Sequence, residues 1–469
     1  MAGTDILAAL RSIVGERFVL TDPADTDSYS LDDAGIRRGH PMAVVRPGST
    51  AEVASVMKAC AAAGVPVVPQ GGNTGLVCGT VADPDAVIVS LSRMNRILSL
   101  NPEDFTMAVE AGCVLEDIRN AADAKSLLFP LSLGAQGSCQ IGGNLATNVG
   151  GINTLLYGTA RDNVLGIEVV LPDGRIWDGM RAVTKDNTGY SLRNLFIGSE
   201  GTLGIITGAV LKLHPRPHTR ETAFCGLDDL DQALPLLDRA RRISGDSVAA
   251  FELISRAGIE QSIAYLDNLS DPLEAPHPWY ALIDFVTTSP GMPLRRTFET
   301  FLEEAFTDGV IVDAVIAESL EQTRTLWRLR EELPEAQKRD AASFKHDVSV
   351  PVRHVPAFIR RATDAVIAAM PGIRPAPFGH MGDGNIHFNT MQPRDMDRET
   401  FESHHVEMNF IVHDIAVGMG GSFSAEHGVG SLKTEDLARY HAGVELELMR
   451  KIKAALDPQG LMNPRTMFG

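Results

Sequence analysis

Apolar residues recur at two spacings along the chain, and segments of the two kinds alternate. The first segment, MAGTDILAALRSIVGERF, carries apolar residues at helical spacing, which predicts an amphipathic helix rather than a signal peptide. From about residue 40, short apolar runs alternate with helical segments. The run PMAVVRP predicts a strand, and STAEVASVMKACAAAG predicts a helix with Ser49 or Thr50 as its N-cap and Gly64 at its end.

Further strands are predicted by VPVVPQ, AVIVSL, TMAVEAG, VLGIEVVLPDGRIW and GTLGIITGAVLKLHP, and a further helix by VLEDIRNAADAK. The DG pair in the fourth of these runs predicts a hairpin turn. Residues 130–160 differ, because they are rich in glycine and asparagine and show little helical periodicity. Glycine loses the most entropy on ordering, so a bound ligand is one way to hold this stretch.

The two prolines of HPRPH, at 214–218, predict a domain boundary. Beyond it lie the strand candidates ETAFCGL, VAAFELI, WYALIDFV and VIVDAVIAES, with the helices DLDQALPLLDRARRI and MPLRRTFETFLEEAF between them. This order favours an antiparallel sheet backed by helices on one face. We therefore expect an α+β protein with domains over 1–218 and 219–425 and a helical C-terminal segment over 426–469.

Composition narrows the class of protein. The 469 residues carry a formal net charge of −18, which fits a soluble protein and argues against a nucleic-acid partner. The five cysteines are scattered and form no CxxC motif, which predicts reduced thiols and a cytoplasmic location. No apolar stretch approaches the roughly 20 residues of a transmembrane helix. A homodimer is the default assembly, because it is the commonest.

Three glycine-containing segments indicate a ligand groove. The chain has no GxGxxG between a strand and a helix and no GxxxxGK[ST], which argues against a Rossmann site and a P-loop. PQGGNTG, at 69–75, alone could be an ordinary glycine turn, although its backbone N–H groups could also approach a pyrophosphate. With GSCQIGGNLATNVGG and with GSEGTLGIIT at 198–207, it outlines a groove for an extended polar ligand.

Histidines and carboxylates gather in two later segments. FGHMGDGNIHFN, at 378–389, predicts a tight turn at GDG, and on a strand His387 and Asn389 would face the same side. GSFSAEHGVG, at 421–430, adds Glu426 and His427. Imidazole and carboxylate suit Zn²⁺ or a similar divalent cation, whereas the alternatives are satisfied surface or core histidines and a solvated loop pair.

The segment LWRLREELPEAQKRDAASFKHD, at 326–347, carries candidate anion-binding residues. The Arg330 guanidinium could form two parallel hydrogen bonds to a carboxylate, and the Lys345 ammonium could add a positive charge. By composition alone the segment reads as a helix with a solvated charged face, broken near Pro334.

The glycine segments together resemble the FAD-binding domain of the vanillyl-alcohol oxidase/p-cresol methylhydroxylase superfamily. The histidine and arginine segments resemble its branch of D-2-hydroxyglutarate and D-lactate dehydrogenases. The resemblance covers residues 40–469. It implies a two-subdomain FAD-binding domain of the p-cresol methylhydroxylase type, an antiparallel-sheet substrate or cap domain with the metal site, and a C-terminal segment that packs back on the FAD domain.

The resemblance implies FAD contacts along the three glycine segments and in the tail. These residues are Pro69, Gly71, Gly72, Asn73, Thr74, Gly75, Pro130, Ser132, Gly137, Gly142, Gly143, Asn144, Thr147, Asn148, Glu200, Gly201, Gly204, Ile206 and Asn463. Some members of the superfamily attach FAD through a histidine in the first loop. This chain carries Asn73 and no histidine there, which predicts non-covalent FAD.

The resemblance also implies the chemistry. His380, His387 and Glu426 would bind the metal, Arg330, Lys345 and Asn389 the substrate, and His427 would bind substrate and act as general base. The metal would make the hydroxyl of a D-2-hydroxy acid more acidic, His427 would take its proton, and a hydride would pass to flavin N5. D-2-hydroxyglutarate would give 2-oxoglutarate. Electron-transfer flavoprotein or a quinone would then accept the electrons.

One position departs from the pattern and leaves the substrate open. Pro334 stands where the hydroxyglutarate enzymes often carry a threonine, and proline donates no hydrogen bond. D-malate and D-lactate therefore remain alternatives. Two further hypotheses are a flavin oxidase that uses oxygen directly, which fast reoxidation by air would reveal, and a non-catalytic metal-binding or hydrolase-like module, which would be colourless when purified.

Overall fold

Two structural units share the chain. The computed structural model describes residues 2–33 and 35–469. The first unit comprises Met1–Gly151, Gly158–Arg216 and Glu426–Gly469, and the second comprises Ile152–Tyr157 and Pro217–Ala425. The chain thus leaves the first unit near the HPRPH segment and returns to it at Glu426. The short excursion over Ile152–Tyr157 has no counterpart among the sequence-based boundaries.

The first unit is built on two sheets and a short ribbon. Within the described residues these are a four-stranded sheet of order β1-β2-β4-β3, a five-stranded sheet of order β5-β6-β10-β8-β9, and the pair β11-β7. Strands β2, β4 and β3 run parallel, whereas the five-stranded sheet is antiparallel. The strands are β1 (Val19–Leu20), β2 (Ala43–Val45), β3 (Val67–Gln70), β4 (Val87–Ser90), β5 (Ile97–Asn101), β6 (Thr106–Glu110), β7 (Leu127–Leu128), β8 (Val164–Val170), β9 (Ile176–Gly179), β10 (Ile205–Lys212) and β11 (His214–Pro215).

Helices of the first unit begin and end largely where local signals place them. The helices are α1 (Ala2–Val14), η1 (Glu16–Phe18), α2 (Pro23–Ser30), α3 (Thr50–Ala63), α4 (Leu115–Asp123), α5 (Ile141–Ala146), η2 (Ala160–Asn163), α7 (Arg193–Phe196), α16 (Thr434–Tyr440) and α17 (Val444–Leu456). The Ser49 side chain accepts the N–H of Glu52 at 3.2 Å, and Gly64 ends α3 with a φ of 66°. The predicted cap, stop and DG turn between β8 and β9 are confirmed.

The glycine-rich stretch departs from its sequence pattern, because it contains the short helices α5 and α6 (Thr154–Tyr157). Helix α5 approaches the end of β6 closely. A Cβ at Gly142 would lie 2.8 Å from the Cβ of Ala111 and 3.0 Å from its carbonyl oxygen. The glycine therefore serves a backbone contact between distant segments, which helical periodicity does not reveal.

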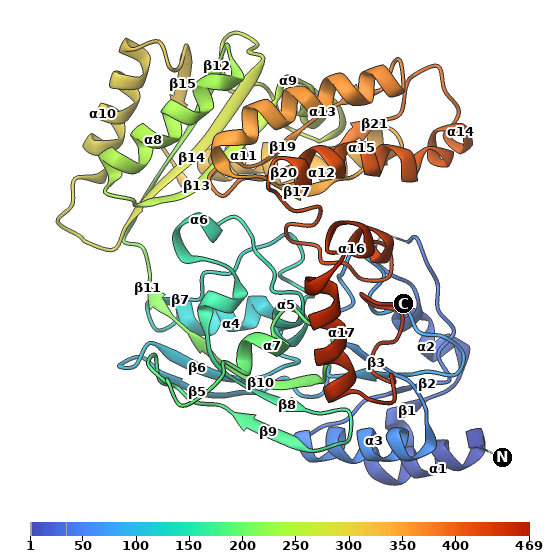
Figure 1. Cartoon of the computed structure of the whole chain (residues 1–469). Helices are drawn as coiled ribbons and strands as arrows, with labels where there is room; N and C mark the ends of the chain where they lie inside the picture. The colour runs from blue at the N-terminus through green and yellow to red at the C-terminus, as the bar shows by residue number, and fades with distance from the viewer. Residues whose placement is uncertain (1, 34) are drawn as a thin grey trace. The chain divides into compact units, whose positions relative to one another are not determined.

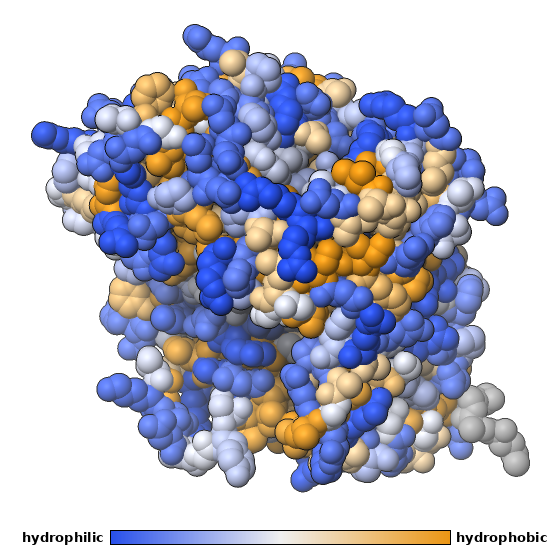
Figure 2. Space-filling view, turned by 45° about the horizontal axis from the view of Figure 1, so that its top comes forward, coloured by the Kyte–Doolittle hydropathy of each residue, from blue (hydrophilic) through white to orange (hydrophobic). Residues whose placement is uncertain are grey.

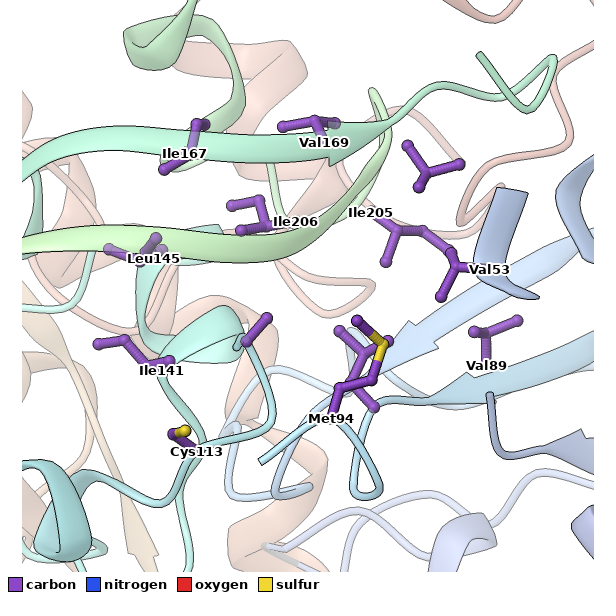
Figure 3. Close-up of a cluster of buried hydrophobic side chains, with 14 of the residues drawn as sticks. Val53, Val89, Met94, Cys113, Ile141, Leu145, Ile167, Val169, Ile205 and Ile206 are labelled. Atoms are coloured by element: carbon purple, nitrogen blue, oxygen red, sulfur yellow. The ribbon is translucent and has the colours of Figure 1, made fainter. Parts of the chain in front are cut away.

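A single hydrophobic cluster joins the two main sheets of the first unit. It includes Val89 of β4, Ile167 of β8, Ile205 of β10 and Val53 of α3, all nearly inaccessible to solvent. Figure 3 shows these side chains converging between the ribbons, with Ile141 of α5 nearby. Helices α1 and α3 lie side by side beside the four-stranded sheet (Figure 1).

The second unit is organised around a large sheet. In the part of the chain that the structure describes, this sheet has seven strands in the order β15-β12-β14-β13-β19-β20-β17, every adjacent pair antiparallel, and a three-stranded sheet β16-β21-β18 accompanies it. The strands are β12 (Thr219–Leu227), β13 (Val248–Ser255), β14 (Trp279–Thr287), β15 (Asp313–Ile316), β16 (Ser343–Phe344), β17 (Asp347–Ser349), β18 (Arg374–Pro375), β19 (Phe378–His380), β20 (Asn385–His387) and β21 (Thr390–Met391).

Helices cover both faces of the large sheet, so the expectation of one covered face is wrong. Besides α6, they are η3 (Leu230–Gln232), α8 (Ala233–Ser244), α9 (Arg256–Tyr265), α10 (Leu294–Thr307), α11 (Leu320–Glu331), α12 (Leu333–Asp340), η4 (Val352–His354), α13 (Val355–Ala369), α14 (Arg398–Ser403) and α15 (His405–Gly418). One core cluster packs α8, α10, α13 and α15 on one face (Figure 1). A second packs α9, α11 and α12 on the other. Strands β13 and β14 are accordingly buried at nearly every position, rather than at alternate ones.

The distribution of hydrophilic residues and the burial of the cysteines are typical of a globular protein. The face drawn in Figure 2 is dominated by hydrophilic residues, with hydrophobic residues in scattered groups. Among the described residues, none of the helices combines the length and the apolar character that a bilayer span requires. All five cysteines lie within the described residues as buried free thiols. Burial raises the pKa of the Cys225 thiol to about 12, which keeps it protonated and unreactive near neutral pH.

Candidate functional site

A cavity in the first unit brings the three glycine segments together with the tail. It holds about 790 Å³ of space, including its solvent-open mouth. Its walls come from the ends of β3 and β10, from α5 and from the C-terminal segment. The lining residues are Pro69, Gln70, Gly71, Gly75, Val77, Gly79, Thr80, Leu91, Gly142, Gly143, Ala146, Thr147, Ser199, Glu200, Gly201, Gly204, Ile205, Ile206, His427 and Asn463.

The loop after β3 presents backbone donors. Across the described residues, no backbone N–H from Gly71 to Gly75 donates a hydrogen bond to another protein group. Asn73 holds the loop in shape, with a φ of 56°, its Oδ1 accepting the Thr80 hydroxyl at 2.8 Å and its amide donating to the Leu31 carbonyl at 2.8 Å. Successive unpaired amides at a glycine turn suit an anion such as a pyrophosphate.

Gly72 serves the packing of the first loop rather than the cavity wall. A Cβ there would lie 2.1 Å from the backbone oxygen of Ser138 and 2.9 Å from the Cα of Cys139. At Gly75, in contrast, an added Cβ would meet no described heavy atom within 4 Å. Gly72 is therefore required for packing between two loops, whereas Gly75 faces the cavity.

We expect Gly72→Ala to lower the stability of the cofactor-free protein by about 1–3 kcal/mol, because the added methyl overlaps backbone atoms that cannot yield easily. Urea unfolding of the cofactor-free variant measures this. Gly75→Ala is the matched control, and it should unfold at the same urea concentration as the wild type. Equal stability of the two variants would show that the two loops are not packed as described.

Two buried acceptors without a partner among the described residues lie on the second glycine segment, outside the lining of the cavity. Gln140 Oε1 and Asn144 Oδ1 are buried and have no hydrogen-bond partner. Buried polar atoms are rarely left unpaired in native proteins. Gln140 precedes α5 and Asn144 lies within it, beside the lining residue Gly143.

Glu200 connects the third glycine segment to the loop that carries His427. Its carboxylate accepts the N–H of Val429 at 2.8 Å and that of Gly430 at 2.7 Å. Burial raises the pKa of Glu200, while these two bonds oppose the rise. The residue was predicted to contact the cofactor. It also orders the backbone immediately after His427, which places that imidazole on the cavity wall.

The tail closes the cavity from another side. The Asn463 amide donates to the carbonyl oxygens of Gly79 and Glu200, at 2.9 and 2.8 Å, and its backbone N–H donates to Val67. Lys453 of α17 donates to the carbonyls of Thr202 and Met462. These bonds make the C-terminal segment an integral part of the first unit.

The remaining predicted FAD residues lie outside the lining of the cavity. They are Gly72, Asn73, Thr74, Pro130, Ser132, Gly137, Asn144 and Asn148. Asn148, for example, accepts the backbone N–H of Arg161 at 3.0 Å and so supports the loop. Sequence reasoning missed Gln70, Val77, Gly79, Thr80, Leu91, Ala146, Ser199 and Ile205 among the lining residues. Gln70 and Ser199 directly adjoin predicted positions, which is the signal that could have found them.

In the second unit, two of the three predicted metal ligands lie on adjacent strands of the large sheet. His380 of β19 pairs with Asn385 of β20, and His387 is two residues further along β20 on the same face. The two imidazole centroids are 5.6 Å apart. Asp347 of β17 accepts the Asn385 amide at 2.9 Å and lies 3.8 Å from His387 Nδ1. The predicted turn at GDG is confirmed, because it joins β19 to β20.

Glu426 directly follows a residue that is hydrogen-bonded to β17. The backbone N–H of Ala425 donates to the carbonyl of Asp347 at 3.1 Å. Ala425 is the last residue of the second unit and Glu426 the first residue of the returning segment. The predicted third ligand is therefore one peptide away from a backbone that β17 anchors.

A buried carboxylate that sequence reasoning missed supports His380. Glu252, 1% exposed on β13, accepts His380 Nδ1 at 2.6 Å and Arg330 Nε at 2.6 Å. Burial by itself would raise the pKa of Glu252, but the charges of His380 and Arg330 outweigh it and lower the pKa to about 2. A lone acidic residue inside the apolar run VAAFELI is the sequence signal for such a role.

The three predicted substrate residues of the second unit lie in different surroundings. Arg330 is 6% exposed on α11, and its Nη2 lies 3.4 Å from His380 Nε2. Lys345 is exposed between β16 and β17. Strand β20 ends at His387, and the N–H of Asn389 donates to the His387 carbonyl at 3.0 Å. Asn389 nevertheless lies on the side that was predicted, because Phe388 packs against α13 on the opposite face of the sheet. Asn389 donates to Gln337 of α12 at 2.8 Å within a buried amide network.

Comparison with known proteins covers the whole chain. A family model described as "FAD linked oxidases, C-terminal domain" matches residues 216–467, and one described as "FAD binding domain" matches residues 41–179. The mitochondrial D-2-hydroxyglutarate dehydrogenase of Bos taurus is 37% identical over 470 residues, which cover 99% of this chain and 83% of that one. The D-2-hydroxyglutarate dehydrogenase of Stutzerimonas stutzeri is 34% identical over the full length of both chains.

Structural comparison agrees on the fold. The crystal structure of p-cresol methylhydroxylase with substrate bound aligns with a TM-score of 0.76, covering 99% of this chain and 96% of that chain at 17% identity. At that identity the likeness concerns the fold alone. The predicted α+β fold of the p-cresol methylhydroxylase type is thereby confirmed.

Proposed function

The chain belongs to the family of FAD-linked oxidases, and from that premise we propose that it oxidises a D-2-hydroxy acid, with D-2-hydroxyglutarate as the first candidate and 2-oxoglutarate as its product. That it is an FAD-dependent dehydrogenase follows from the family and from its relatives. The observation that carries the proposal is the position of His427, an imidazole able to accept a proton, on the wall of the same cavity as the glycine loops.

The residues of the cavity fit FAD. The amides of Gly71–Gly75 would hold the pyrophosphate, because none of them donates to another group of the described protein. When bound, FAD supplies the hydride acceptor that amino-acid side chains lack. Glu200 and Asn463 hold the surrounding loops in place, and this keeps the imidazole of His427 at the cavity wall.

For a divalent cation, the proposed ligands are His380 and His387 of the second unit and Glu426, the first residue of the returning segment. Two imidazoles and a carboxylate form a donor set that suits Zn²⁺ or a similar cation. Bound there, the cation would make a nearby hydroxyl more acidic. A metal binds the neutral imidazole, and the Glu252 carboxylate, which can only accept, would keep the proton of that neutral form on Nδ1 and leave the lone pair of Nε2 to the metal.

Arg330 and Lys345 are the proposed partners of the substrate carboxylates. Arg330 lies beside His380, so an anion that it binds would also be near the metal ligands. Pro334 lies at the start of α12 and has no N–H to donate. Discrimination between D-2-hydroxyglutarate, D-malate and D-lactate then falls to the other residues around Arg330 and Lys345.

The decisive experiment is a panel of D- and L-2-hydroxy acids with an artificial dye as electron acceptor, before and after removal of metal with a chelator. We expect turnover of D-acids, most efficient with D-2-hydroxyglutarate, and loss of that turnover when metal is removed. Re-addition of Zn²⁺ or Mn²⁺ controls for damage by the chelator. Turnover of L-acids alone, or turnover indifferent to complete metal removal, would contradict the proposal.

We expect the flavin to be bound without a covalent link, because the first loop carries Asn73, whose amide side chain cannot form the histidyl bond. Precipitation of the holoenzyme with acid should leave the yellow colour in the supernatant, as an absorbance spectrum will show. Flavin absorbance that stays with the denatured pellet would refute this expectation.

We further propose that electrons leave the flavin to a separate acceptor, such as electron-transfer flavoprotein or a quinone, rather than to oxygen. The names of the relatives as dehydrogenases support this. Stopped-flow reoxidation of the reduced enzyme in air-saturated buffer tests it. Rapid formation of hydrogen peroxide would instead indicate an oxidase.

A further inference from the structure

One buried carboxylate lies between the proposed metal ligand and the proposed substrate arginine. Glu252 is near the middle of β13, on the face of the large sheet that α11 and α12 cover. Its two oxygens have different partners. Oε1 accepts Nδ1 of His380, and Oε2 accepts Nε of Arg330, each at 2.6 Å.

These two hydrogen bonds also fix the protonated nitrogen of His380 and the orientation of Arg330. In the neutral imidazole, which is the form that binds a metal, the bond to Nδ1 sets the tautomer of His380, so that Nε2 carries the lone pair. The bond to Nε sets the plane of the Arg330 guanidinium, and Phe378 packs against that guanidinium with its ring centroid 4.7 Å away. As a result, Arg330 Nη2 is held 3.4 Å from His380 Nε2.

We propose that Glu252 is a positioning residue that orients His380 for metal binding and Arg330 for binding the substrate carboxylate, and so couples the two subsites. The inference rests on the proposed function, because it assigns His380 and Arg330 their roles there. It predicts that a single change at Glu252 weakens metal affinity and substrate affinity together.

The alternative is that Glu252 serves only the stability of the second unit, and Asp284 offers a matched comparison. Asp284 is also 1% exposed and lies on β14, the strand next to β13. It accepts the Thr222 hydroxyl at 2.7 Å and Trp327 Nε1 at 3.2 Å. Among the described residues, no hydrogen bond or ion pair joins Asp284 to His380 or Arg330.

The test compares Glu252→Gln with Asp284→Asn, each an uncharged isostere of a buried carboxylate. The glutamine can keep its oxygen toward only one partner. If its NH₂ faces His380, the imidazole must accept at Nδ1, which places the proton on Nε2 and blocks metal binding. If its NH₂ faces Arg330, two donors meet and the guanidinium loses its anchor.

For Glu252→Gln we expect the dissociation constant for Zn²⁺, measured by competition with a chromophoric chelator on FAD-loaded protein, to rise about 10–100-fold. The KM for D-2-hydroxyglutarate should rise as well. Asp284→Asn should lower the melting temperature while leaving both quantities within about twofold of the wild type. A visible spectrum of the Co²⁺-loaded protein should change for Glu252→Gln and not for Asp284→Asn.

Three other outcomes are informative. If the wild type binds Zn²⁺ but Glu252→Gln binds it equally well and keeps its KM, the coupling role is overturned and the proposed metal site survives. If the wild type binds no Zn²⁺, both are overturned. If Glu252→Gln does not fold, Glu252→Asp replaces it. The shorter carboxylate cannot reach both partners, so unchanged Zn²⁺ affinity and unchanged KM in that variant would overturn the coupling role.

Discussion

Replacing His427 with asparagine is expected to lower kcat by about 10²–10⁴-fold, the usual contribution of a general base. The imidazole lies on the wall of the cavity that the glycine loops form, and an asparagine side chain could not accept a proton near neutral pH. Measurement of kcat with saturating D-2-hydroxyglutarate and dye acceptor checks the effect. The ratio of flavin to protein absorbance should stay at the wild-type value, because Glu200 would still hold the loop.

His441→Asn is the control for this variant. His441 belongs to the same unit and directly follows α16. Its Nδ1 lies 2.9 Å from the carboxylate of Glu445 in α17. It is absent from the cavity lining, so its replacement should leave kcat unchanged. A His427 variant that retains kcat within about threefold of the wild type would remove His427 as the base, since general-base catalysis is worth far more than that.

Replacing Arg330 with alanine is expected to raise the KM for D-2-hydroxyglutarate strongly and to leave FAD bound. It should also lower the free energy of unfolding, by at most about 3–5 kcal/mol, because it removes one of the two partners of the buried Glu252 and leaves His380 as the other. The side chains of Arg330 and Glu252 are 7% and 1% exposed, so solvent cannot replace the lost partner. Initial-rate kinetics and urea unfolding measure the two effects separately.

Arg328→Ala on the same helix separates substrate binding from stability. Arg328 pairs with Glu332 one turn away, and both side chains are exposed. Exposed pairs contribute little to stability, so this variant should match the wild type in both measurements. If Arg330→Ala loses stability yet keeps its KM, Arg330 has a structural role alone and Lys345 becomes the principal candidate for the substrate carboxylate.

Local signals in the sequence were reliable wherever one segment contains all the interacting atoms. The Ser49 cap, the Gly64 stop, the DG turn and the GDG turn each depend on residues a few positions apart, and each forms as predicted. The break after α11, next to Pro334, is of the same kind. His387 and Asn389 also face the side of the sheet opposite to Phe388, as predicted, although β20 itself ends at His387.

In the candidate site, too, the features that depend on one segment could be predicted, and those that depend on distant segments could not. The types of the residues in the glycine segments and in FGHMGDGNIHFN indicated an extended anion and a cation, because backbone amides and imidazoles have defined chemistry. The role of Gly72 could not be read from its segment, since its neighbour Ser138 is far away in the chain. Glu252 was overlooked for the same reason, because its partners come from β19 and α11.

By itself, the sequence determined the helix caps and turns, the chemistry available to each segment and the family resemblance, because all three are properties of residues close together in the chain. Tertiary structure alone decided that both faces of the large sheet are covered, that His427 lies on the wall of the cavity, and that one carboxylate holds both His380 and Arg330. The physical reason is that burial and hydrogen bonding depend on which distant segments meet, and local periodicity carries no information about that.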